Sequence, residues 1–359
     1  MPPEAASTQL PARSTRERIA GLLGPLARWE AGLVLVLIAT VIYGARQSPN
    51  FLKTDNLFYI GSNIGETAII AIPMALLIIT GEIDLSVASI LGLSGLTMAT
   101  LYAHHGWPIL AAMAAALVVG ALAGAFNGVL VTYLGLPSLA VTIGTLALFR
   151  GIAQIINAND TVGGLPASLT KIGIIPIPHT QIPYSIAIFA GLALVAAVVL
   201  HATSLGRSIF AIGANQEAAF FSGIRVKRTK LWLFVLSGVI SGLAGILWTL
   251  KFASARYDAG AGLELEAITV VLLGGVSIFG GRGTLFGVVV AAAILGALKQ
   301  ALTLAHISPQ QQSIVIGVLL LTSAVVPASR DLYRRAYASV KASAARRRGQ
   351  AASEQGALP

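Results

Sequence analysis

Cysteine is absent from this chain of 359 residues, and charged residues are scarce. Without a thiol, the sequence excludes disulfides, cysteine nucleophiles, iron–sulfur clusters and cysteine-ligated zinc. Only 11% of the residues are charged, against about 25% in an ordinary soluble domain. Hydrophobic residues make up 56%, and the mean hydropathy is +0.82. This balance predicts a helical protein that crosses a membrane several times.

Motifs for nucleotide hydrolysis and nucleophilic catalysis are also missing. No glycine is followed directly by lysine, so the chain lacks the G-x-x-x-x-G-K-[ST] loop that holds the phosphates of ATP. The G-x-S-x-G motif of serine hydrolases does not occur either. The five histidines show no i, i+4 pairing of the kind that binds zinc on a helix. We therefore expect no enzyme activity, no cofactor and no bound metal.

Basic residues outnumber acidic ones, and the net charge of the chain is +10. In a soluble protein this could indicate nucleic-acid binding, but basic residues interleaved with aromatic ones are not found here. Cytoplasmic loops of membrane proteins collect Lys and Arg. Most of the 24 basic residues lie in segments 1–28, 202–230 and 331–359. We therefore predict that both termini and the middle segment are cytoplasmic, and that the basic tail contacts anionic lipid.

Long apolar runs predict an all-α polytopic membrane protein, because a bilayer core is crossed by about 20 apolar helical residues. We expect about ten transmembrane helices, near residues 29–45, 57–80, 87–103, 109–133, 138–156, 184–201, 231–250, 265–279, 284–305 and 312–327. The transmembrane domain is thus 29–330, between a retained cytoplasmic tail (1–28) and a basic cytoplasmic tail (331–359). Arg150 and Lys299 lie inside spans near their outer ends, where long side chains can reach the headgroups.

A polar interruption, GRSIFAIGANQEAAFFSGIRVKRTK, occupies residues 206–230 between two apolar spans. Residues 215–223 favour a short helix, flanked by Gly213 and by four basic residues between Arg225 and Lys230. The chain has such a helix and lacks energy-coupling chemistry of its own. This combination indicates that it is one subunit of a larger assembly.

Two breaks in the apolar pattern carry the other candidate residues. The first, Gly81–Ser86, places Glu82 and Asp84 between two spans, and charges at membrane depth are costly and usually functional. Asp84 and Ser86 are equally suited to cap the next helix, and we favour that role over a substrate pathway. Asn127, within the fourth span, either bonds a neighbouring helix or lines a cavity.

The second break, residues 274–287, contains six glycines, which permit positive φ and close helix contact. Gly283 and Gly287 have the GxxxG spacing of tightly packed helices, as do Gly120–Gly124, Gly124–Gly128 and Gly238–Gly242. The candidate translocation-path or hinge residues of both breaks and the fourth span are Glu82, Asp84, Ser86, Asn127, Gly274, Gly275, Gly280, Gly281 and Gly283.

Four acids, Glu66, Asp258, Glu264 and Glu266, lie at predicted outer ends of spans. They could bind the hydroxyls of a polar solute or the basic face of a partner, and simple solvation is the interpretation we favour. Residues 66–81 and 266–281 also resemble each other loosely, since each has an acid, an apolar run and a glycine break. Such internal repeats are common in transporters.

Three blocks together resemble the membrane permeases of bacterial ABC importers for monosaccharides, within the group of ribose, rhamnose and autoinducer-2 permeases. Residues 79–86, ITGEIDLS, are similar to the family's G-G-I-D-L-S block, with Glu82 in place of a glycine. Residues 212–224 are similar to its cytoplasmic coupling segment. Residues 273–287 are similar to its glycine-rich block. The likeness extends from about residue 30 to residue 327.

The resemblance implies a dimer of two copies, or of this chain and a related permease, in the bacterial inner membrane. Two ATP-binding cassette ATPase subunits would bind on the cytoplasmic side, and a periplasmic sugar-binding protein would deliver a monosaccharide or small polyol. It also implies a coupling helix that contacts the ATPase, formed by Asn215, Gln216, Glu217, Ala218, Ala219, Ser222 and Gly223. The alternatives are an ion-coupled secondary transporter, disfavoured by the position of the acids at span ends, and a membrane scaffold without a path.

Overall fold

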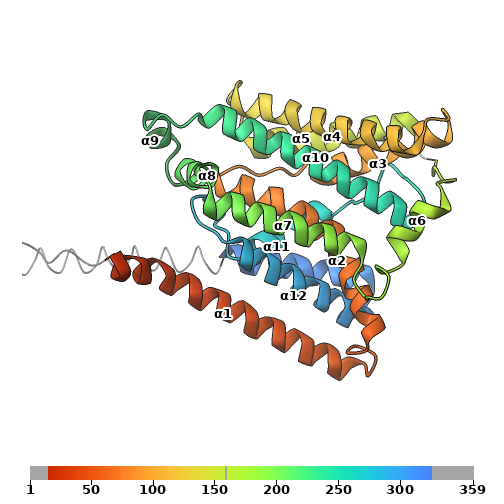
Figure 1. Cartoon of the computed structure of the whole chain (residues 1–359), viewed down its shortest axis with the longest axis horizontal. Helices are drawn as coiled ribbons and strands as arrows, with labels where there is room; N and C mark the ends of the chain where they lie inside the picture. The colour runs from red at the N-terminus through yellow and green to blue at the C-terminus, as the bar shows by residue number, and fades with distance from the viewer. Residues whose placement is uncertain (1–14, 158–159, 326–359) are drawn as a thin grey trace, which may run out of the picture.

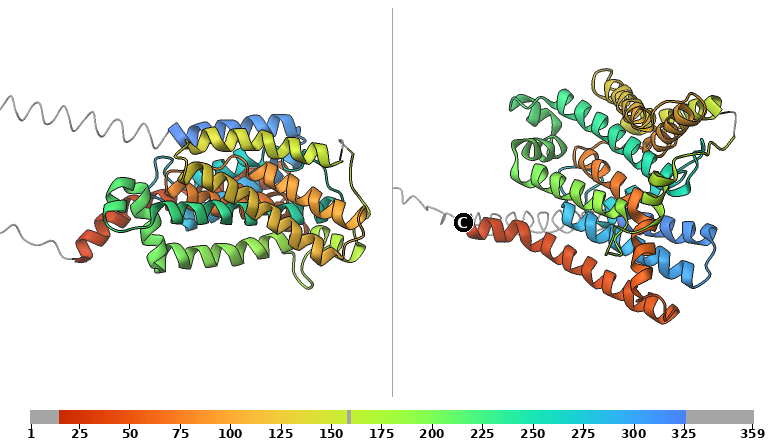
Figure 2. Two further views of the ribbon diagram at one scale, coloured as in Figure 1. Left: turned by 90° about the horizontal axis from the view of Figure 1, so that it is seen from above. Right: turned by 45° about the vertical axis from the view of Figure 1, so that its right-hand side comes forward.

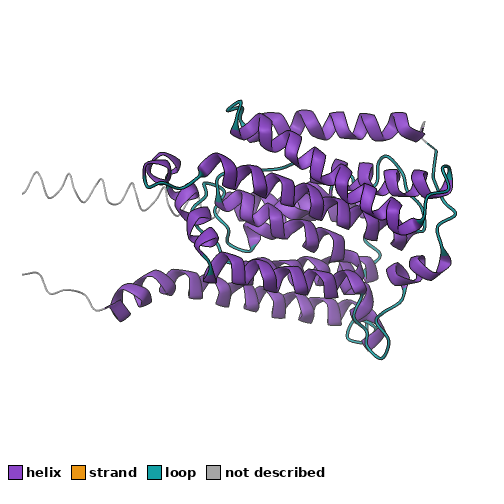
Figure 3. Cartoon of the chain, turned by 45° about the horizontal axis from the view of Figure 1, so that its top comes forward, coloured by secondary structure: helices purple, strands orange, loops and turns teal. Residues whose placement is uncertain are grey.

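The computed structural model describes residues 15–157 and 160–325, and within these ranges all the longer regular elements are helices (Figure 3). The helices are α1 (Thr15–Gln47), α2 (Thr54–Ile79), α3 (Val87–Ala103), α4 (Ile109–Thr132), α5 (Ser138–Asn157), α6 (Ala167–Ile174), α7 (Tyr184–Ala202), α8 (Ser204–Ala214), α9 (Gln216–Phe221), α10 (Val226–Phe252), α11 (Leu263–Leu273) and α12 (Leu285–Leu304). Residues 309–325 are also helical. The predicted all-α fold is confirmed for this part of the chain, and the tail 331–359 lies outside it.

The long helices run side by side, so the bundle has two ends (Figure 1). Helices α8 and α9 lie at one end, here called the α9 end, and α6 lies at the other, the α6 end. Helix α1 begins at the α9 end, as the views in Figure 2 also show. This arrangement places most of the polar interruption of the sequence at the α9 end of the apolar bundle.

Seven helical segments among the described residues are long and apolar enough to cross a membrane. They are α2, α4, α5, α7, α10, α12 and residues Trp29–Gln47 of α1. Helix α3 is apolar but has only 17 residues. The chain is therefore a polytopic helical membrane protein.

Helix α11 corrects one predicted span. We expected a helix over residues 265–279, but α11 has 11 residues and ends at Leu273. At 1.5 Å per residue it is about 16 Å long, roughly half the hydrocarbon thickness of a bilayer. Gly274 caps the helix and Gly275 has a φ of 86°, which turns the chain away. A left-handed residue of this kind is a common helix terminator.

The core of the bundle is built around α2. Its most apolar stretch is 94% buried inside the protein, whereas that of α7 is only 17% buried. Helices α7, α10, α11 and α12 all pack against it. Large apolar side chains remain exposed on the outer helices, including Leu122 on α4, Ile155 on α5 and Leu194 on α7. An apolar outer surface of this kind suits contact with lipid or with another membrane subunit.

Glycines allow α4 and α10 to pack with their backbones in contact, as the GxxxG spacing predicted. A Cβ atom on Gly120 would lie 2.4 Å from the carbonyl oxygen of Gly238, and one on Gly124 would lie 2.2 Å from that of Phe234. The Gly283–Gly287 pair does not form a helical motif, because α12 begins only at Leu285. Gly287 instead packs against the carbonyl group of Gly274.

Candidate functional site

The predicted short helix is present as α9, held between two helix-ending signals. Asn215 adopts an extended conformation, and its side-chain oxygen accepts a hydrogen bond from the Ala218 N–H at 2.9 Å. Gly223 ends the helix with a φ of 83°, and the Ile224 N–H returns to the carbonyl oxygen of Ala219 at 3.1 Å. Both are local features of the sequence, which is why residues 215–223 could be assigned correctly.

Two aromatic residues that we did not predict dominate the exposed face of α9. Phe220 is 65% exposed and Phe221 is 79% exposed, and their rings meet edge to face at 5.6 Å. Glu217 and Ser222 are also exposed. Ala219, which we counted as a coupling residue, is 4% exposed and packs inward with Ile212 and Val226. Adjacent aromatic residues inside a polar segment were the available signal for this surface.

The three blocks that carry the family resemblance meet at one place beside α9. The Gly281 N–H donates a hydrogen bond to the carbonyl oxygen of Ile79 at 2.8 Å, which joins the second break to the first. Gly213, in the last turn of α8, packs against both, since a Cβ there would lie 1.7 Å from that same oxygen. Gly280 has a φ of 79° and lies against Gly213 and Gly81. Glycine is therefore required at these positions, because the backbones of the first break, α8 and the second break are in direct contact.

The remaining glycines of the second break shape the turn between α11 and α12. Gly274 packs on the first turn of α12, and Gly283 has a φ of 156°. A Cβ on Gly275 would lie 2.6 Å from the Trp29 ring. The indole N–H of Trp29 donates to the carbonyl oxygen of Leu273 at 3.2 Å, so α1 holds the end of α11.

Glu82 and Asp84, two residues apart, have different partners. Glu82 pairs with Lys230 of α10 at 2.5 Å. Asp84 is fully buried and accepts hydrogen bonds from the N–H and hydroxyl groups of Ser86 and from the hydroxyl of Ser237. Asn127 donates to the Ser86 hydroxyl at 2.7 Å. The structure therefore brings three candidate path residues, Asp84, Ser86 and Asn127, into one buried network.

The capping interpretation of this break is only half right. Ser86 occupies the N-cap position of α3 but makes no side-chain capping bond. Asp84 instead fixes the turn that precedes the helix and ties it to Ser237 on α10 and, through Ser86, to Asn127 on α4. A buried carboxylate is stable only with hydrogen-bond partners, and those of Asp84 come from its own turn and from α10.

Two acids that we expected to be solvated form ion pairs with lysines nearer the α6 end. Glu66, midway along α2, is 3% exposed and pairs with Lys251 at 3.1 Å. Glu266 of α11 pairs with Lys299 of α12 at 2.9 Å and accepts a hydrogen bond from Thr67 at 3.1 Å. Lys299 therefore does not extend to the headgroups as expected. The solvation interpretation was wrong for Glu66 and Glu266.

Asp258 lies in the loop between α10 and α11, and Arg150 of α5 contacts the same loop. Asp258 is half-exposed and accepts two hydrogen bonds from Arg256, which hold the pKa of its carboxyl group below the ordinary value. Arg150 of α5 donates to the carbonyl oxygens of Tyr257 and Ala259 at 2.7 and 2.9 Å. Arg150 thus fastens this loop to α5 rather than extending to the headgroups.

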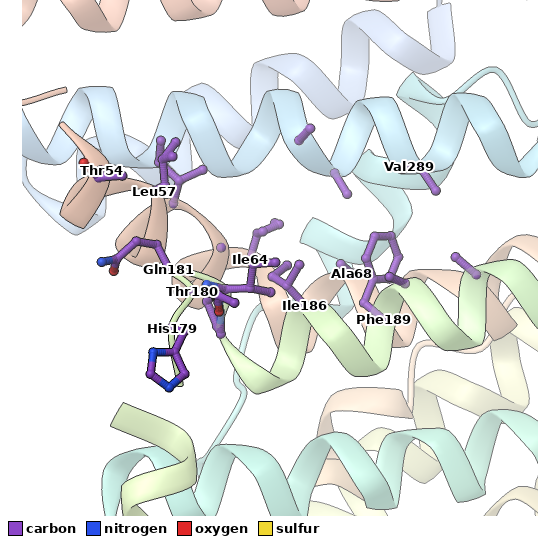
Figure 4. A pocket seen from close by; sticks show the side chains of 18 residues that line it. Thr54, Leu57, Ile64, Ala68, His179, Thr180, Gln181, Ile186, Phe189 and Val289 are labelled. Carbon is purple, nitrogen blue, oxygen red and sulfur yellow. Dashed lines mark hydrogen bonds between the residues drawn. The ribbon is translucent and has the colours of Figure 1, made fainter. Parts of the chain in front are cut away.

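A large cavity in the described part of the chain does not suit a sugar. It measures about 1160 Å³ and lies between α2, α7 and α12, as the close view in Figure 4 shows. Most of its lining side chains are aliphatic, such as Leu57, Ile64 and Ile186, and its polar residues gather near His179 at one end. A monosaccharide would leave its hydroxyl groups without partners there, which is unfavourable.

An apolar helical bundle with buried polar breaks and an exposed aromatic helix fits a membrane permease. The chain belongs to the family whose model is described as "Branched-chain amino acid transport system / permease component", which matches residues 56–324. The chain is therefore a multi-pass protein of the inner membrane.

Similar curated proteins are permeases too. The autoinducer 2 import system permease protein LsrD of Photorhabdus temperata is 33% identical over 318 residues, which cover 87% of this chain and 94% of LsrD. The D-allose transport system permease protein AlsC of Escherichia coli K12 is 35% identical over 289 residues, covering 80% of this chain and 88% of AlsC. No solved structure matches the chain. The resemblance to permeases of monosaccharide importers is confirmed.

Proposed function

We propose that the chain is the permease subunit of an ATP-driven importer that carries a monosaccharide or a related small polyol. A periplasmic binding protein delivers the solute, and separate ATP-binding cassette subunits hydrolyse ATP. Two permeases, identical or related, surround the path. The chain crosses the membrane about ten times with both termini and α9 in the cytosol. The D-allose and autoinducer 2 relatives support this class of solute.

The observation that carries this proposal is the construction of α9. It projects from the bundle at one end, is capped at Asn215, and exposes two phenylalanines (Figure 1). Its flanking residue Gly213 touches both polar breaks, so a force on α9 reaches the bundle through backbone contacts. Exposed aromatic residues on a rigid element are typical anchors for a partner protein. We assign α9 as the coupling helix, with Phe220 and Phe221 as its anchors.

Replacing both Phe220 and Phe221 by alanine tests the assignment. Truncation of two anchors costs about 2 kcal/mol or more each, so ATPase subunits should no longer co-purify and uptake should fall more than tenfold. Phe252→Ala is the matched control, because this phenylalanine is 53% exposed at the α6 end. All variants should reach the membrane in normal amounts. Uptake at the wild-type rate in the double variant would show that α9 is not the coupling helix.

An ion-coupled transporter remains the alternative, because Glu66 lies midway along α2 rather than at its end. Intramembrane acids often bind protons or ions in such proteins. Glu66 and Glu266 are each neutralised by a lysine, however, and a titrating site at either of them would have to break its ion pair. Vesicles that contain only this chain should accumulate no sugar under a proton or sodium gradient, and accumulation would favour the alternative.

A further inference from the structure

The buried side chain of Lys230 joins α9 to the first break through two contacts, one with Glu82 and one with the exposed residue Gln216. Its Nζ atom lies 2.5 Å from Oε1 of Glu82 and 2.5 Å from Oε1 of Gln216, the first residue of α9. Lys230 is 5% exposed, and the side chain of Glu82 is 15% exposed. One ammonium group therefore connects α10, α9 and the segment between α2 and α3.

We propose that Lys230 is a positioning residue that transmits movements of α9 to the first break, Gly81–Ser86. The proposal rests on the proposed function, because it assumes that α9 is moved by an ATPase subunit. From the sequence, Lys230 was one of the four basic residues that flank the short helix. Its burial against Glu82 and Gln216 gives it an internal role instead.

The strength of this connection comes from burial. A lysine has three donors and no acceptor, and here two of the donors are used by oxygens of separate segments. A buried charged group that loses its partner destabilises the protein, whereas a charged group exposed to water does not. A displacement of Gln216 therefore draws Lys230 with it, and Glu82 has to follow. Lys227, one turn earlier on α10, is exposed and can move without this constraint.

Beyond Glu82, the connection continues into two helices. The N–H of Ile83 donates to the Ser138 hydroxyl at 3.2 Å, and the Thr142 hydroxyl donates to the carbonyl oxygen of Ile83 at 3.3 Å. Both partners belong to the first turns of α5. Asp84 bonds Ser237 on α10. A shift of Glu82 thus acts on α5, whose outer face is one of the exposed apolar surfaces of the bundle.

The test uses Lys230→Met and Glu82→Gln in the assembled importer, with its ATPase subunits and binding protein. The measured quantity is solute taken up per ATP hydrolysed, because a defect confined to stability would not change this ratio. Each variant should lower the ratio about tenfold, within the usual range of coupling energies, while basal ATP hydrolysis changes less than twofold. The double variant should be no worse than either single one, since the two residues act as a unit.

Lys227→Met is the matched control and should keep the wild-type ratio. If Lys230→Met does not accumulate, the double variant decides the question, because it leaves neither a buried acid nor a buried ammonium without its partner. Wild-type ratios in these variants would overturn the proposal. Additive losses in the double variant would also overturn it, because they would mean independent roles.

The outcome can be separated from a failure of the proposed function. If the Phe220 and Phe221 variant loses uptake while the Lys230 and Glu82 variants keep the normal ratio, only the positioning role is wrong. If the phenylalanine variant keeps normal uptake, the coupling assignment of α9 itself is wrong. A lowered ratio of solute taken up to ATP hydrolysed in the Lys230 variants would then have a cause other than the movement of α9.

Discussion

At the scale of single residues, the pair between Glu66 and Lys251 shows how this protein holds charge inside an apolar bundle. Lys251 also donates to the carbonyl oxygen of Ser62, one turn before Glu66 on the same helix. The carboxylate side chain is only 4% exposed. Removing two charges from water is expensive, so the pair is stable only while both members are present. The pair also fixes the α6 end of α10 against α2.

Glu66→Gln should therefore destabilise the protein by about 3–5 kcal/mol, because it leaves the Lys251 ammonium buried without its counter-charge. A double variant that adds Lys251→Met to Glu66→Gln should recover much of the lost stability. Thermal unfolding in detergent, followed by tryptophan fluorescence, measures both effects. Asp258→Asn is the control, since its pair with Arg256 is exposed, and it should leave the unfolding temperature unchanged. Equal losses at Glu66 and Asp258 would contradict the argument.

Local features were predictable from the sequence, and distant partners were not. Asn215 and Gly223 could be recognised as the ends of α9, because capping depends on neighbours a few residues away. Lys230 looked like one more basic residue of a flank. Its partner Glu82 is 148 positions away, and only the packing of α10 against the first break brings them together.

At the scale of helices, glycine decides how closely two elements approach. The contact between α4 and α10 is the most extensive in the bundle and depends on backbone contact at Gly120, Gly124 and Gly238. Gly191 of α7 offers a contrast, because a Cβ there meets nothing within 4 Å. A glycine-to-alanine substitution should therefore destabilise the protein at a helix contact such as Gly238, but not at an open position such as Gly191.

Gly238→Ala should destabilise the bundle by about 1–3 kcal/mol, since its Cβ would lie 2.1 Å from the carbonyl oxygen of Gly120 and would force the helices apart. Gly191→Ala should be neutral or stabilising by up to about 1 kcal/mol, because alanine is the better helix former. Thermal unfolding of the two variants side by side measures the difference. A loss of stability in Gly191→Ala equal to that in Gly238→Ala would show that glycine flexibility, not close packing, matters here.

Element boundaries were less predictable where apolar sequence continues past the end of a helix. The run that begins near Glu266 stays apolar beyond Leu273, so hydropathy alone extends it to residue 279. The positive φ of Gly275 ends the helix and cannot be read from hydropathy. The loose repeat has a structural counterpart, since Thr67 bonds Glu266 near one end of the two segments and Ile79 bonds Gly281 at the other. The two segments therefore run side by side in the same direction.

At the scale of the whole molecule, the distribution of charge predicts which end of the bundle faces which side of the membrane. The α9 end carries Arg225, Lys227 and Arg228 on its exposed surface. Basic residues are retained on the cytoplasmic side, so α9 should face the cytosol and α6 the periplasm. The absence of cysteine makes this orientation directly measurable, because every introduced thiol is the sole thiol of the chain.

Ser222→Cys, beside α9, and Thr180→Cys, in the loop that follows α6, place one exposed thiol at each end. In intact spheroplasts a membrane-impermeant maleimide should label Thr180→Cys and leave Ser222→Cys unlabelled. Inverted vesicles should give the reverse pattern, because the cytoplasmic face is then outside. The unmodified chain is the control for background labelling. Labelling of Ser222→Cys in intact spheroplasts would place α9 in the periplasm, where no ATPase could reach it, and both the coupling assignment and the role of Lys230 would then fail.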